Sequence, residues 1–440
     1  MGSGLTALKM LLRPHYSSGT QLLPAYERAF ARSFIGADVP TLAFGRGRVA
    51  LWSILNAVGV DDGCEVVVPA YTCETVPMAV KFAGARCVYA DTEPGRYNVP
   101  LQGAADALTP GTRAVICQHT YGIRQPVQGW IAWAAEQGVL LIEDRCQLAA
   151  EGRNGDAGAI LADAAYFSTH FSKPFSTAQG GMAAFSDAEL YAGVKRVRDR
   201  FSSEDSAQRP RALALQTLLY AVTVRPATRA IVGGIFRWAQ RSGLIRGTVS
   251  RDEYRDVMPG DYLSCATNFH AAVGTRELLR WRANQQHRRR LTRYYLESLA
   301  SLGIDLDAFP RNDDDAALLM VPILVTNKEE LLSRAARRAL PLGTWFDRCP
   351  AHLDRRRARQ YDYRPGQCPN AEYLVSKEIH LLTAPWVSLQ QARRAVRFVE
   401  KYAHCAAPPE SIEKSESHRS WMHRRVDHEH FPSGLPRPGV

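Results

Sequence analysis

Lys173 is the residue in this sequence with the clearest potential for covalent chemistry. It stands alone in a stretch of small and hydroxyl side chains, FSTHFSKPFSTAQGG, that runs from Phe167 to Gly181. A lysine that is desolvated in a pocket of small residues becomes a nucleophile that can condense with an aldehyde. On spacing alone, a surface lysine at a turn before Pro174 is the favoured interpretation. The lysine therefore needs partners elsewhere in the chain before it defines a site.

A candidate partner is Asp144, which ends the apolar run VLLIED. Such a run is typical of a buried parallel strand, and α/β proteins place their sites at the carboxyl ends of these strands. Pyridoxal phosphate needs a carboxylate that keeps its ring nitrogen protonated and a lysine that holds its aldehyde. Asp144 and Lys173 could supply both groups.

A third element suits a phosphate group. The stretch FGRGRVAL, from Phe44 to Leu51, is a glycine turn that leads directly into a predicted helix. The free backbone N–H groups and the dipole of a helix start favour a phosphate, although an ordinary glycine-containing helix start has the same pattern. Ser168, at the end of its own predicted strand, would place a hydroxyl within reach of the same phosphate.

Short β-branched runs alternate with amphipathic helical stretches between Val49 and Phe185, which predicts a parallel sheet covered by helices. The predicted helices are 49–58, 75–83 and 127–137, and the predicted strands are 65–68, 86–90, 114–118, 139–143 and 164–168. Later patterns predict helices at 278–299, 328–338 and 389–402 and a strand at 318–325. The expected organisation is an N-terminal segment (1–40), a large α/β domain (41–260) with a helical insertion (about 190–260), a linking helix and small C-terminal α+β domain (261–404), and a disordered tail (405–440).

The composition excludes several classes of protein. The net charge of +11 has its densest run at His287 to Arg290, but no nucleic-acid-binding signature accompanies it, so we expect no nucleic-acid partner. Nine cysteines without a C-x-x-C pair indicate neither a disulfide framework nor a zinc site, and no metal is expected.

The N-terminal sequence has no secretory signal, which predicts a cytoplasmic protein. Apolar stretches within 211–244 predict a packed helical hairpin, and the alternative is a helix that lies on a membrane surface, as peripheral membrane contact.

The motifs together, in this order along the chain, resemble the DegT/DnrJ/StrS family of pyridoxal-phosphate sugar aminotransferases from about Phe44 to Tyr402. They are GRGRVALW, PAYTCETV, LIEDRCQ, FSTHFSKPFSTAQGG and CPNAEYLVSKEIHLLTAPWVS. The resemblance implies the aspartate aminotransferase type of fold (fold type I), with a mainly parallel sheet flanked by helices.

The resemblance also assigns roles to individual residues. It places Lys173 at the lysine that bonds to the cofactor and Asp144 at the aspartate that pairs with the pyridine nitrogen. Gln147 falls beside the ring hydroxyl. The remaining cofactor-binding positions are Ser168, Gly47 and Arg48 at the phosphate and Cys73 at the ring. His170 matches a family histidine whose role we leave open.

Several positions depart from the family pattern. Cys73 replaces the aromatic residue that stacks on the cofactor ring, so that Tyr71 could take part instead. Arg48 replaces a small hydroxyl residue, and Arg145-Cys146 replaces small residues. Leu263 and Cys265 fall where the family has an asparagine and an arginine, of which the asparagine reaches the partner subunit's phosphate.

The function implied by the resemblance is transfer of an amino group, with glutamate as the expected donor, to a nucleotide-linked keto sugar for polysaccharide or antibiotic sugar biosynthesis. A homodimer is implied as well. The alternative is a member of the family that binds the cofactor but has a non-transaminating chemistry or a role as a sensor or partner protein.

Overall fold

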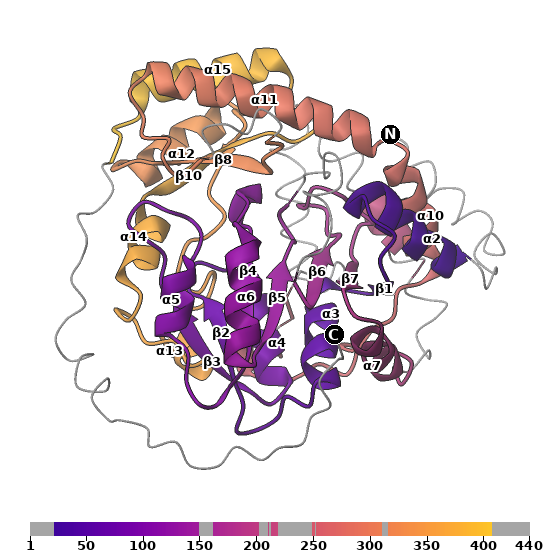
Figure 1. The fold of residues 1–440 in the computed structure, drawn as a ribbon. Coiled ribbons are helices and arrows are strands. Elements are labelled where there is room, and N and C mark those ends of the chain that lie inside the picture. Colours follow the sequence, from indigo (N-terminus) through magenta and orange to yellow (C-terminus); the bar gives the residue numbers. More distant parts are fainter. Residues whose placement is uncertain are drawn as a thin grey trace.

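The computed structural model describes residues 22–148, 162–201, 210, 213–218, 249, 250, 252–309 and 316–406. Two sheets organise these residues (Figure 1). The larger sheet has seven strands in the order β1-β7-β6-β5-β4-β2-β3. Its strands are β1 (Thr41–Phe44), β2 (Glu65–Pro69), β3 (Arg86–Ala90), β4 (Thr112–Gln118), β5 (Leu140–Asp144), β6 (Ala164–Ser168) and β7 (Gly181–Phe185). Strands β2 to β6 pair in parallel, whereas β7 pairs antiparallel with both β6 and β1.

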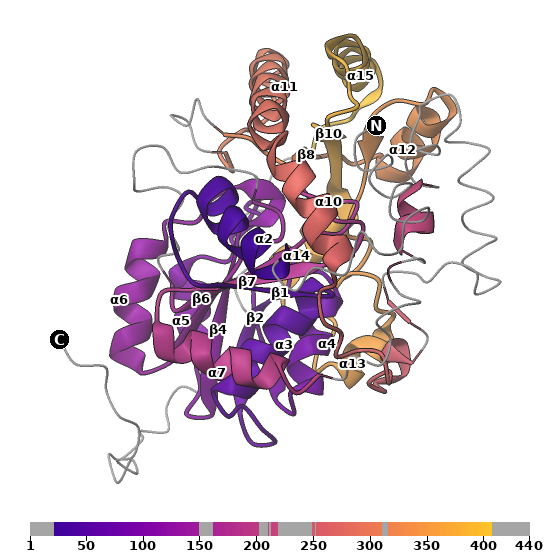
Figure 2. The ribbon, with the colours of Figure 1, turned by 90° about the vertical axis from the view of Figure 1, so that its right-hand side faces the viewer.

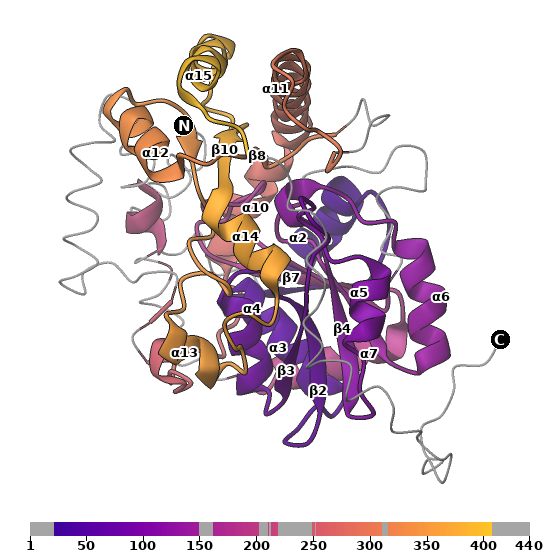
Figure 3. The ribbon, with the colours of Figure 1, turned by 90° about the vertical axis from the view of Figure 1, so that its left-hand side faces the viewer.

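Helices cover both faces of this sheet (Figures 2 and 3). One face is covered by α3 (Gly47–Ala57), α4 (Thr75–Phe82) and α7 (Ala188–Arg198), and the other by α5 (Leu101–Asp106), α6 (Val127–Gln137) and α2 (Leu22–Phe30). The strands are buried on both sides, which explains why their sequences read as continuous apolar runs.

A three-stranded sheet forms the second unit, in the order β8-β10-β9 with antiparallel pairing. Its elements are β8 (Met320–Leu324), α12 (Lys328–Arg337), β9 (Leu342–Gly343), α13 (Arg355–Gln360), α14 (Pro369–Lys377), β10 (Glu378–Leu382) and α15 (Leu389–Tyr402). Helices α10 (Asn268–Leu278) and α11 (Trp281–Ser301) connect it to the larger sheet, and α11 packs against α15 (Figure 1). Short helical turns, η2 (Ala31–Ile35), η3 (Thr120–Gly122) and η4 (Glu253–Arg255), complete the described elements.

Most predicted elements are present, and the differences have physical reasons. The predicted helix at 278–299 is α11, but it begins at Trp281, and α10 precedes it as a separate helix. Strands β1 and β7 were not predicted, because β1 has only four residues and β7 begins with a glycine. The predicted disorder from 405 onward is wrong at its start, since Cys405 pairs with Val325 and the Ala406 N–H donates to the Leu324 carbonyl.

Two predictions fall largely outside the described residues. The apolar segment 211–244 is described only at 213–218, and the tail beyond residue 406 is not described. Among the helices of the described ranges, none is long and apolar enough to cross a membrane.

Candidate active site

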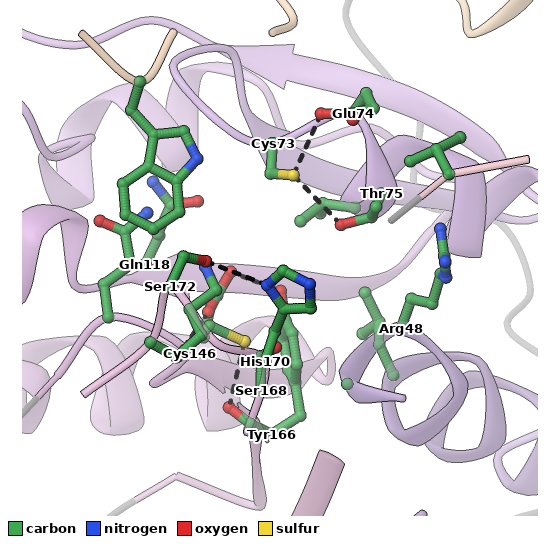
Figure 4. A pocket seen from close by; sticks show the side chains of 18 of the residues that line it. Arg48, Cys73, Glu74, Thr75, Gln118, Cys146, Tyr166, Ser168, His170 and Ser172 are labelled. Atoms are coloured by element: carbon green, nitrogen blue, oxygen red, sulfur yellow. Dashed lines mark hydrogen bonds between the residues drawn. The ribbon is translucent and has the colours of Figure 1, made fainter. Parts of the chain in front are cut away.

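All seven residues predicted for the site line one cavity of about 510 Å³ at the carboxyl ends of β4, β5 and β6. They are Gly47, Arg48, Cys73, Asp144, Gln147, Ser168 and Lys173. Figure 4 shows Cys73, Glu74 and Thr75 on one side of this cavity and Cys146, Tyr166 and Ser168 on the other, with Arg48 at one end. The arrangement leaves a slot between two walls, which suits a flat ring.

Asp144 ends β5 and is buried at the floor of the cavity. Its Oδ2 accepts a hydrogen bond from the Tyr166 hydroxyl at 2.5 Å, and its Oδ1 accepts one from the Cys146 N–H at 2.9 Å. Burial and the adjacent carboxylate raise the pKa of Tyr166 well above its usual value, so the phenol remains a donor. The carboxylate is therefore held in a fixed orientation by two donors.

Tyr166 was not predicted, although a signal for it exists. It pairs with Asp144 in the register between β5 and β6, and it precedes Ser168 by two residues. Residues two apart on a strand point to the same face. A hydroxyl beside Asp144 could have been inferred once the two strands were placed side by side.

Gln147 lies close to Asp144 and is also buried. Its Oε1 accepts a hydrogen bond from the Tyr121 N–H at 2.6 Å, so its amide nitrogen is the end left to face the cavity as a donor. Tyr121 has a φ of 58°, and its hydroxyl lies 2.7 Å from that of Tyr71. Tyr71 is fully buried and does not line the cavity, so the structure gives no support to Tyr71 as a replacement for the aromatic residue at position 73.

Lys173 is carried by the loop between β6 and β7. Its backbone N–H donates to the His170 carbonyl at 3.0 Å, and Asn284 on α11 donates to the Pro174 carbonyl at 3.1 Å. At the end of this loop, a Cβ added to Gly181 would lie 2.5 Å from the carbonyl carbon of Arg46. Glycine at this position lets β7 pass against the start of α3, which brings the lysine loop and the predicted phosphate site together.

The start of α3 lies against the end of β6. A Cβ added to Gly47 would lie 3.0 Å from the Ser168 Cβ, so the backbone of the helix start and the serine approach each other closely. An adjoining cavity of about 60 Å³ is lined by both residues and by Arg46, Arg48 and Thr75, among others. The backbone N–H groups of a helix start, a hydroxyl and guanidinium groups suit an oxyanion such as phosphate.

Arg48 is buried and forms an ion pair with Glu253, with Nη1 and Oε1 2.5 Å apart. Arg46 pairs in the same region with Asp261 at 3.2 Å, and burial together with the charge of Arg48 lowers the pKa of Arg46. Glu253, which sequence reasoning missed, thus compensates the arginine that replaces the family's small hydroxyl residue. The backbone of residue 48 remains at the helix start, where the family's phosphate contact is expected.

Cys73 presents a thiol to the cavity. Burial and the carboxylate of Glu74 raise the pKa of Cys73 to about 12, and its Sγ donates to that carboxylate at 3.1 Å. The thiol is therefore neutral and unreactive at ordinary pH. Cys146 lies across the cavity, and burial raises the pKa of its thiol as well (Figure 4).

His170, whose role the sequence left open, lines the cavity with Nδ1 3.2 Å from the Ser172 hydroxyl. Burial and the positive charges of Lys173 and Arg48 lower the pKa of His170 to about 4. The imidazole is therefore neutral at pH 7.

Leu263 and Cys265 are the two remaining positions that depart from the family pattern. Cys265 forms a β-bridge with Phe44, directly before the glycine turn, and Leu263 packs against the core on the α3 face of the sheet. Neither residue lines the cavities described above.

Arg145, another departure from the family, belongs to a buried charge cluster behind Asp144. Its Nε lies 2.8 Å from Glu143 Oε2, and His119 Nε2 lies 2.9 Å from the same oxygen. The Gln125 N–H donates to His119 Nδ1, which leaves the proton on Nε2 to be donated to Glu143. Burial alone would raise the pKa of Glu143, but Arg145 and His119 outweigh burial and lower this pKa to about 2.

This cluster leads to a prediction about stability. Glu143→Gln is expected to lower the free energy of unfolding by about 3–5 kcal/mol, because Arg145 would be left buried without its carboxylate. The lowered pKa means that Glu143 stabilises the fold fully above its ordinary pKa of 4.5, and that this contribution is lost as the pH falls toward about 2. Urea unfolding between pH 7 and pH 3 should show a shallower pH dependence for the variant.

A matched control is Glu330→Gln, which breaks the exposed pair of Glu330 with Arg334 on α12. Such a pair contributes about 0.3–0.5 kcal/mol. Equal losses in the two variants would contradict a stabilising role for the buried cluster.

Comparison with known proteins agrees with this site. Residues 6–215 and 243–400 match the model of the DegT/DnrJ/EryC1/StrS aminotransferase family, and the chain belongs to this family. The resemblance found in the sequence is thereby confirmed.

Individual relatives resemble the chain only at low sequence identity. The chain is 34% identical over 157 residues to a UDP-N-acetyl-3-dehydro-alpha-D-glucosamine 3-aminotransferase of Acidithiobacillus ferrooxidans. The aligned region covers 36% of this chain and 42% of that relative. It is 23% identical over 386 residues to the spore coat polysaccharide biosynthesis protein SpsC of Bacillus subtilis, covering 86% of this chain and 89% of that protein. The matched part spans roughly a third to a half of the length of the first relatives.

Solved structures confirm the fold. The crystal structure of ntda from Bacillus subtilis with bound cofactor PMP matches with a TM-score of 0.68 and 20% identity, covering 91% of this chain and 82% of that one. A DegT/DnrJ/EryC1/StrS aminotransferase from Brucella abortus matches with a TM-score of 0.67 and 19% identity, covering 91% and 94%. The predicted fold class, with its mainly parallel sheet flanked by helices, is therefore confirmed.

Proposed function

We propose that this chain is a pyridoxal-phosphate-dependent aminotransferase that transfers an amino group, from glutamate, to a nucleotide-linked keto sugar. The observation that carries the proposal is that Lys173, the buried Asp144 and the Gly47–Ser168 contact line one continuous cavity. The nucleotide-sugar aminotransferases among its relatives support the class of acceptor. The basic net charge of +11 suits an anionic substrate.

The donor set of the cavity fits pyridoxal 5'-phosphate. Lys173 would hold its aldehyde carbon, Asp144 its ring nitrogen and Gln147 its ring hydroxyl. The backbone at Gly47 and Arg48, with the Ser168 hydroxyl, would hold the phosphate, and the Cys73 thiol would contact the ring. When bound, the cofactor supplies an electron-accepting ring that stabilises the negative charge left on a substrate carbon after its proton is removed.

Side chains of this chain provide the charge and the proton transfer that the reaction needs. Asp144 carries the negative charge, and its two donors, Tyr166 and the Cys146 N–H, prevent it from turning away. With its amine free, Lys173 would take a proton from the substrate carbon as a general base and deliver it to the cofactor carbon that carries the amino group as a general acid. His170 is neutral at pH 7 and adds no second positive charge beside this lysine.

The decisive experiment is an absorbance spectrum of the purified protein, loaded with pyridoxal phosphate, before and after addition of glutamate. We expect the visible band of the lysine-bound cofactor to disappear and the near-ultraviolet band of the amino form to grow. Addition of nucleotide-linked keto sugars one at a time should restore the visible band with the true acceptor. Binding of the cofactor without any change on addition of glutamate would overturn the proposal.

That outcome would favour the second candidate function, a family member that binds the cofactor without transamination. The observation behind this candidate is Cys73, which places a thiol where the family has an aromatic ring. The homodimer and the cytoplasmic location stay predictions.

A further inference from the structure

An aromatic side chain that sequence reasoning did not single out lies directly against the reactive nitrogen. Lys173 Nζ lies over the indole ring of Trp345, 4.4 Å from its centre, and both side chains line the same cavity. Lys173 lies in the loop between β6 and β7 of the large sheet, whereas Trp345 follows β9 of the small sheet. The atom to which the cofactor would be attached is thus covered by a residue from the other part of the molecule.

The loop that carries Trp345 is anchored by two residues that follow it in the chain. The neighbouring Phe346 is fully buried and packs edge-on against Tyr71, with ring centres 4.7 Å apart. A few residues later, the Ala351 N–H donates to the Thr72 carbonyl at 3.1 Å. Both anchors attach the loop to the segment before α4, and Trp345 itself is half-buried and packs against the hydrophobic core that contains Tyr71 and Phe346.

The two tyrosines of the cavity wall contact groups other than Lys173. Tyr166 donates to Asp144, and the ring of Tyr254 lies under the guanidinium of Arg357, 5.1 Å from its centre. Cys73 supplies a thiol and no aromatic surface. Among the aromatic rings that line the cavity in the described part of the chain, Trp345 is the one whose face is directed at the lysine nitrogen.

We propose that Trp345 is the aromatic residue that contacts the cofactor at its bond to Lys173, in place of an aromatic ring at position 73. The inference rests on the proposed function. An indole face attracts a positively charged nitrogen, and it attracts it more strongly than a phenyl face does. Trp345 would keep this contact with the nitrogen of Lys173 when the cofactor is attached to it.

The first test is fluorescence, which needs no turnover. The chain has eight tryptophans, and a cofactor held against one of them should quench it more strongly than the others. We expect pyridoxal phosphate to quench the wild type clearly more than Trp345→Phe. Trp133→Phe is the matched control, because Trp133 lies on α6, packs against Trp130 and is not part of the cavity wall. It should not alter the quenching of the remaining tryptophans.

The second test is affinity for pyridoxal phosphate, measured by titration of the apo protein. Trp345→Ala should weaken binding about 2- to 30-fold, the range of a cation–π contact, and Trp345→Phe should recover part of the loss. Cys73→Ala should weaken binding less than Trp345→Ala does.

These experiments distinguish a failure of the proposed function from a failure of the role proposed for Trp345. A wild type that binds no cofactor or does not respond to glutamate contradicts the proposed function. A responsive wild type whose quenching is unchanged in Trp345→Phe, or a larger loss in Cys73→Ala than in Trp345→Ala, overturns the role of Trp345.

Discussion

Replacing Lys173 with alanine is expected to lower kcat by at least about 10⁴-fold and to remove the visible band of the lysine-bound cofactor. The loss combines a missing nucleophile with a missing proton carrier, and proton transfer by a positioned side chain alone contributes about 10²- to 10⁴-fold. The measurement is a single-turnover assay with glutamate, followed by absorbance. Turnover in the alanine variant would contradict the assignment of this lysine.

Lys173→Arg separates charge from reactivity. A guanidinium keeps the positive charge near Trp345 but stays protonated, so it cannot act as a nucleophile. We expect this variant to be as inactive as the alanine variant. Lys195→Ala is the matched control, since Lys195 lies exposed on α7 in a pair with Asp199 and away from the cavity. Its turnover should equal that of the wild type.

Part of the cavity wall could be predicted from the sequence because Asp144 ends β5 and Ser168 ends β6, two strands that pair in parallel. Gly47 follows β1, which pairs antiparallel with β7 and was not predicted, and its signal was the glycine turn before a helix. Where strands pair in parallel, residues far apart in the sequence but placed at strand ends share one edge of the sheet. The strand pattern of this half of the chain therefore predicted which residues, far apart in the sequence, lie close together in the structure.

The residues that sequence reasoning missed lack such a local signal. Trp345 reaches Lys173 from a loop of the small sheet, and its position depends on Phe346 packing against Tyr71. Glu253 reaches Arg48 from the short turn η4. A loop between two elements has no periodicity that fixes its direction, so contacts made by loops follow from tertiary packing and not from spacing.

Two arginines that depart from the family pattern have the same structural explanation. Arg48 is buried with Glu253, and Arg145 is buried with Glu143. An uncompensated buried charge is costly, and each arginine has a carboxylate from the surrounding structure. The departures therefore change how the walls of the site are built, while Lys173, Asp144 and Ser168 keep their places at the cavity.

Replacing Asp144 with asparagine is the second change with a large expected effect. The amide is nearly the same size and still accepts a hydrogen bond, but it carries no negative charge to hold a proton on the cofactor's ring nitrogen. We expect kcat to fall about 10³-fold, as for the loss of a fixed electrostatic partner, with a much smaller effect on cofactor affinity. Rates of the glutamate half-reaction and a cofactor titration measure the two quantities separately.

Two companion variants test whether charge at this position, rather than packing, is responsible. Tyr166→Phe removes one donor to Asp144 but leaves its charge, so the rate should fall only about tenfold, in line with one hydrogen bond to a charged group. Asp163→Asn alters a carboxylate that accepts from the Leu141 N–H at the opposite end of the same strands, and it should leave the rate nearly unchanged. A rate loss in Asp163→Asn as large as in Asp144→Asn would mean that the strands are disturbed in general, whereas the expected order of losses, with Asp144→Asn far ahead of Tyr166→Phe, requires the charge of Asp144 itself.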